Sequence, residues 1–140
     1  MTRISTATAA LLAIIFSYVG ISSAAWLLSR SFVSGSAFDF AAASVYRKLV
    51  SYYLPAVLTG AVAGWIGLSA ALLIVRSASA RTSAIVASAF FAILSILGLM
   101  VAGSDALSFD LASLSLARVF GIVGGFWASI QDVSRDRAPN

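Results

Sequence analysis

The chain has 140 residues, of which 61% are hydrophobic and 10% are charged, and its net charge is +4 at pH 7. Soluble globular domains carry roughly 25% charged residues, so this composition excludes a water-soluble core and predicts an integral membrane protein. The sequence has no cysteine, histidine or glutamate, so disulfides, iron–sulfur clusters and histidine-ligated haem or zinc lack their usual ligands. We therefore expect no cofactor and no metal.

Four long apolar stretches fill most of the chain, at residues 7–29, 49–75, 84–103 and 111–130. Each can cross a bilayer, because a spanning helix needs about 20 mostly apolar residues and satisfies its backbone polar groups internally. The sequence predicts one all-α domain, an integral membrane four-helix bundle, followed by a polar tail at 131–140. The first stretch also fits a secretory signal with a small-residue cleavage site at 23–25, but its length favours a retained span.

Basic residues predict how the bundle is oriented. With the N-terminus inside, the inner side carries Arg3, Arg76, Arg81, Arg135 and Arg137, and the outer side carries Arg30, Arg47 and Lys48. The positive-inside rule therefore places both termini inside. The charge lies at membrane edges rather than in a basic stripe with interleaved aromatics, which favours membrane lipids over nucleic acid as partners. Size and composition suggest a bacterial inner (plasma) membrane.

A ten-residue segment with Phe-Asp at its start and Arg at its end occurs twice, at 38–47 and 109–118. Both copies precede or open a span that begins on the outer side of the membrane. This indicates a duplicated helical hairpin with a pseudo-twofold axis along the membrane normal. Asp39 and Asp110 suit helix N-termini, where a carboxylate is favourable. In a pseudo-twofold arrangement, Asp39 could instead pair with Arg118, and Asp110 with Arg47.

Arg118 is the costliest residue of the chain, because it lies about two turns inside the fourth apolar stretch. An arginine at mid-membrane costs roughly 2.5 to 3.5 kcal/mol on insertion scales. Four expectations follow: the side chain reaches lipid headgroups, pairs with an aspartate of this chain, meets an acidic residue of another subunit, or attracts anions in a pore.

Small residues recur at every fourth position of two spans, with Gly60 and Gly64 on the second and Ala117, Gly121 and Gly125 on the fourth. Such faces allow helix backbones to approach closely in lipid. They either pack within the bundle, or the face of the fourth span docks another membrane subunit or a second copy. Two further residues of the second span carry structural expectations, since Pro55 should bend it and Trp65 should pack at mid-depth.

These features favour a small non-catalytic membrane protein that acts as an accessory or scaffold subunit of a membrane complex. The alternative is a homo-oligomeric channel or small-solute transporter, including a holin-like pore. An enzyme is disfavoured, because the candidate acids, bases and nucleophiles reduce to Asp39, Asp110, Tyr46 and serines without a base.

Overall fold

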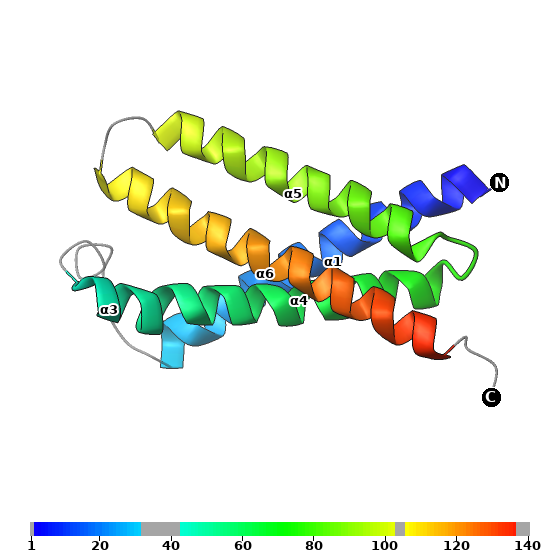
Figure 1. The fold of residues 1–140 in the computed structure, drawn as a ribbon, viewed down its shortest axis with the longest axis horizontal. Helices are drawn as coiled ribbons and strands as arrows, with labels where there is room; N and C mark the ends of the chain where they lie inside the picture. Colours follow the sequence, from blue (N-terminus) through cyan, green and yellow to red (C-terminus); the bar gives the residue numbers. More distant parts are fainter. Residues whose placement is uncertain (1, 32–42, 103–105, 137–140) are drawn as a thin grey trace.

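In the computed structural model, the described residues are 2–31, 43–102 and 106–136, and they form four long helices without a strand (Figure 1). The helices are α1 (Thr2–Ser31), a composite second helix, α5 (Ala80–Ala102) and α6 (Ala106–Asp136). The second helix consists of α3 (Val45–Lys48), the π-helical turn η1 (Leu49–Tyr53) and α4 (Leu54–Ile74). All four are long and apolar enough to cross a membrane, which confirms the predicted all-α bundle of membrane-spanning helices.

The helices extend beyond the apolar stretches from which they were predicted. At the C-terminal side, α6 continues through the polar segment to Asp136, so residues 131–136 of the predicted tail are helical, and 137–140 lie outside the described residues. A helix that has left lipid can continue into water with residues of good helix propensity, such as Gln131. A contact between Asp132 and α4, described below, also holds this last part of α6.

Each helix has two principal neighbours in the bundle. The closest pair is α4 and α6; α1 packs against α4 and α5, and α5 packs against α6, whereas α4 and α5 hardly meet. In Figure 1, α4 and α6 cross while running in the same direction, and α1 begins and α6 ends at the end of the bundle opposite α3. We call the end where α3 lies the α3 end. Which side of the membrane it faces stays a prediction.

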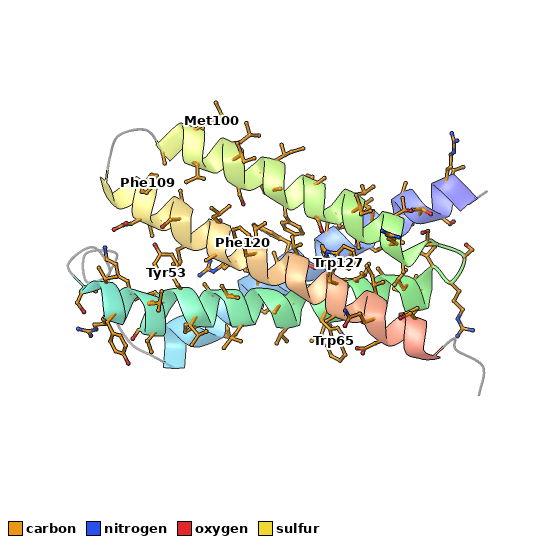
Figure 2. All side chains as sticks on the ribbon, in the orientation of Figure 1. Tyr53, Trp65, Met100, Phe109, Phe120 and Trp127 are labelled. Carbon is orange, nitrogen blue, oxygen red and sulfur yellow. The ribbon has the colours of Figure 1, made fainter. Side chains whose placement is uncertain are left out.

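The interior of the bundle is built mainly from small residues, and most of the large apolar side chains are exposed. Buried positions include Ala13, Ala71 and Ala87, with Phe91 and Phe126 as the largest core side chains. Met100, by contrast, is 74% exposed and points away from the bundle (Figure 2). This distribution suits lipid, in which helices associate through close packing rather than through burial of large apolar groups.

A π-helical turn, Leu49–Tyr53, lies just before Pro55, where a bend was predicted. The backbone N–H of Leu54 donates to the carbonyl oxygen of Leu49, five residues back, instead of four. Proline has no N–H to continue the regular hydrogen-bond ladder, and the π turn relaxes that ladder immediately before the proline. The turn also changes which side chains of the second helix face α6.

Candidate functional site

Four glycines form the contact between α4 and α6. A Cβ atom added to Gly60 or Gly64 would come closer than 3.0 Å to backbone atoms of α6, and one added to Gly121 or Gly125 would do the same with α4. Real Cβ atoms essentially never approach other atoms so closely. The two backbones therefore touch, and the structure brings these four predicted interaction residues together inside the chain.

The register of this contact differs from that of the sequence repeat. Gly60 lies against the Arg118 carbonyl, and Gly121 lies against the Val57 carbonyl. Each glycine thus contacts the residue three positions before the other, so Gly60 and Gly121 occupy corresponding places in the contact. They are 61 positions apart. The repeat instead relates residues 71 positions apart. With corresponding residues 61 positions apart, Arg118 lies level with Val57. The repeat would instead place Arg118 level with Arg47, which is about 15 Å along the helix from Val57. The duplicated hairpin stays a prediction, and residues 38–42 of its first copy, including Asp39, lie outside the described residues.

An ion pair joins the second helix to α6 near the α3 end. Lys48 Nζ lies 3.1 Å from Asp110 Oδ2, and the two side chains are 22% and 25% exposed. The pseudo-twofold hypothesis offered Arg47 as the partner of Asp110, but the neighbouring Lys48 makes this contact and the Arg47 side chain is exposed. Adjacent residues on a helix point about 100° apart, so only one of the two can face α6.

Next to the ion pair, Tyr53 lies on the side of the second helix that faces α6 (Figure 2). Its hydroxyl is 2.7 Å from Ser113 Oγ, and Ser113 Oγ in turn donates to the Asp110 carbonyl oxygen at 2.7 Å. A serine hydroxyl has a single hydrogen, so Tyr53 is the donor to Ser113. In a regular α-helix, Lys48 and Tyr53 would point about 140° apart, whereas the π turn places both against α6.

Two further hydrogen bonds connect α4 and α6 beyond the glycines. Ser69 Oγ and Ser129 Oγ are 2.9 Å apart, and Trp65 Nε1 donates to Asp132 Oδ2 at 2.8 Å. Trp65 was predicted only as a packing residue, but its 43% exposed side chain also makes this polar contact. Neither pair was predicted from the sequence, because their separations of 60 and 67 positions follow no repeat that the sequence shows.

Arg118 lies at a separate cleft of about 320 Å³ between α1, α5 and α6. Its side chain is partly buried, and it is the charged member of a lining that also carries Tyr18, Ser22, Ser95 and Ser115. Apolar and small residues complete the lining: Ile21, Phe91, Leu94, Gly98, Ala112, Val119 and Ile122.

Arg118 makes no ion pair or side-chain hydrogen bond with any residue in the described part of the chain. Asp39, the partner that the repeat offers Arg118, lies outside the described residues, and Asp110 is paired with Lys48. Ala117, the remaining predicted interaction residue, is partly buried on the same helix. Of the predicted site residues on α6, Arg118 is the one that lines this cleft.

A second groove, between α1 and α4, has a similar volume of about 320 Å³ but different chemistry. Thr59 is its polar lining residue, and the single hydrogen of the Thr59 hydroxyl is already taken by the carbonyl oxygens of Pro55 and Ala56, which lie 2.8 and 3.1 Å from Oγ1. This groove therefore presents an apolar surface, and the polar cleft is the one at Arg118.

Comparison of the chain with protein-family models, curated proteins and solved structures finds no match.

Proposed function

We propose that this protein is a small non-catalytic integral membrane protein that acts as an accessory or scaffold subunit of a membrane complex. The observation that carries the proposal is the use of polar side chains within the bundle. Lys48 with Asp110, Tyr53 with Ser113 and Ser69 with Ser129 all join the second helix to α6. These hydroxyl, ammonium and carboxylate groups hold helices together, which is a structural use rather than a chemical one.

The glycine contact argues against a pore through a single bundle and so also supports the proposal. Around Gly60, Gly64, Gly121 and Gly125 the backbones of α4 and α6 are too close to admit even a methyl group. A solute path between these two helices would require them to separate along their closest contact. A path between several copies of the chain is the competing possibility, and the experiment below addresses it.

The glycine faces also restrict where a partner subunit can bind. Because α4 and α6 cover each other's glycines, a partner cannot use the face of Gly121 and Gly125 unless it displaces α4. We therefore expect the partner to contact side chains that point away from the bundle, such as Phe120, which is 70% exposed.

The test is affinity purification of a tagged copy from its native host in a mild detergent, with mass determination of the complex and identification of retained chains. A different membrane subunit in fixed stoichiometry is the expected result. An unrelated tagged four-span protein at equal expression controls for carry-over. An untagged second copy of this chain reports self-association.

A homogeneous species that contains only copies of this chain would contradict the scaffold proposal. In that case, solute flux through liposomes reconstituted with the protein would test the channel alternative. The two measurements use the same purified material, so they can be made in sequence.

A further inference from the structure

We propose that the cleft between α1, α5 and α6 binds the phosphate group of an anionic membrane lipid, with Arg118 as the principal contact. The cleft holds about 320 Å³, and its lining combines Arg118 and the hydroxyls of Ser22, Ser95 and Ser115 with apolar side chains. An anionic lipid has the same two parts, a charged headgroup and apolar acyl chains. This inference is independent of the proposed scaffold function.

The position of Arg118 suits a ligand that enters from one membrane surface. It lies nine residues after Phe109, where the membrane-spanning part of α6 begins, which corresponds to about 13 Å of helix. Helical side chains lean toward the N-terminus of their helix, and for α6 this is the α3 end. An arginine side chain at this position is therefore favoured to extend toward the α3 end.

The small and polar lining residues continue in the same direction. Ser115 lies about one turn before Arg118 on α6, and Gly98 lies four residues before the end of α5 at Ala102. On α1, Ser22 lies in the half that approaches the α3 end. The cleft and its hydrogen-bonding groups thus extend from Arg118 toward the membrane surface at the α3 end, where the phosphate groups of lipids lie.

The chemistry of the lining favours a phosphate. A guanidinium presents a planar fork of N–H donors that matches two phosphate oxygens at once, and serine hydroxyls can donate to the others. None of the described residues that line the cleft is an Asp that would repel an anion. An anion in the cleft would also neutralise a cation that is costly to hold in the membrane.

The size of the cleft favours a headgroup over a transmembrane helix of another protein. A volume of about 320 Å³ lies at the lower end of the range for small-ligand sites. An α-helix with its side chains is about 10–12 Å across, so a partner helix could at most rest on the cleft and insert one acidic side chain. That arrangement is the competing explanation, and it predicts a protein ligand instead of a lipid.

The first measurement is native mass spectrometry of the full chain released from mild detergent. We expect retained phospholipid, and we expect delipidated protein to rebind dioleoylphosphatidylglycerol in preference to dioleoylphosphatidylcholine. Arg118→Gln should weaken rebinding of the anionic lipid by about tenfold or more, because charge-assisted hydrogen bonds are lost. Arg76→Gln, in an exposed connection, is the matched control and should rebind normally.

A second pair of variants tests the cleft without altering the charge. Gly98 lines the cleft, and a Cβ added there meets nothing within 4 Å, so Gly98→Leu should narrow the cleft while the bundle stays folded. Gly124 also has open space around an added Cβ but does not line the cleft, which makes Gly124→Leu the control. We expect Gly98→Leu alone to reduce lipid binding, with thermal unfolding confirming that both variants are folded.

Several results would overturn the proposal. Equal lipid retention by Arg118→Gln and the wild type would remove Arg118 from the site, and equal losses in Arg76→Gln would indicate a general effect of charge. Normal binding by Gly98→Leu would place the lipid outside the cleft. Binding of inorganic phosphate without lipid, or an Arg118-dependent partner protein with unchanged lipid content, would identify a different ligand.

Discussion

The α4–α6 contact and the Arg118 cleft place similar residues in opposite environments. In the α4–α6 contact, glycines bring two backbones together and the neighbouring polar side chains are paired. In the cleft, Gly98 and three serines leave space, and Arg118 lacks a partner among the described residues. Small residues in a membrane helix therefore do one of two things: they admit another backbone, or they leave room for something that is not part of the chain.

The largest expected effect comes from the closed contact. Gly121→Ala would place a methyl group against the Val57 carbonyl and 2.9 Å from the Ala61 nitrogen, and neither backbone atom can move independently of its helix. We expect a loss of about 1–3 kcal/mol or more, measured as thermal or denaturant unfolding in detergent. Gly124→Ala, three residues further along α6, has open space and should unfold like the wild type. Equal behaviour of the two variants would contradict the observed contact.

The next prediction tests whether Lys48 or its neighbour Arg47 pairs with Asp110. Lys48→Asp would oppose two carboxylates at Asp110, and the pair is only 22% and 25% exposed. We expect a loss between the roughly 1 kcal/mol of exposed pairs and the roughly 3 kcal/mol of buried ones. Combining it with Asp110→Lys should restore most of that stability, whereas Arg47→Asp should change little. If Arg47→Asp rescued Asp110→Lys instead, that result would support the Asp110–Arg47 pair predicted from the repeat and contradict the Lys48–Asp110 pair.

A smaller effect is expected at the far end of the same contact. Trp65→Phe keeps most of the ring but removes the N–H that donates to Asp132. Because the site is partly exposed, we expect a loss of about 1 kcal/mol, again from unfolding in detergent. Trp127→Phe is a suitable control, since Trp127 has a similar exposure of 47%. A larger loss at Trp127 would show that ring packing, and not the hydrogen bond, determines the result.

The smallest effect concerns the hydroxyl pair beside the π turn. A double-mutant cycle of Tyr53→Phe and Ser113→Ala should give a coupling energy near the average of about 0.6 kcal/mol for hydrogen bonds between membrane helices. The four unfolding curves of the cycle measure it. A coupling of zero would indicate that Tyr53 and Ser113 do not interact in the folded protein.

The helices and their class were predictable from the sequence, because apolar length alone determines whether a segment can cross a bilayer. The glycines at 60, 64, 121 and 125 were also recognisable as surfaces for close packing. Their pairing was not, since small residues at every fourth position fit a helix of the same chain as well as one of another.

The details of the site depended on geometry that residue spacing does not contain. The π turn shifts the facing residues of the second helix, so the choice between Arg47 and Lys48 required the three-dimensional register. The repeat, 71 positions apart, also pointed to a register that the glycine contact does not follow. Arg118 was recognisable as an exceptional residue because charge in lipid is costly, but its cleft also requires α1, which is remote from α6 in sequence.

The parallel pairing of α4 with α6 has a consequence for biosynthesis. A chain is made from its N-terminus, so α1, α4 and α5 leave the ribosome before α6 does. During that interval Gly60 and Gly64 have no α6 backbone to pack against, and Asp110, the partner of Lys48 in the finished bundle, has yet to be made. Insertion of α6 supplies both contacts at once, so the tightest part of the protein is assembled late.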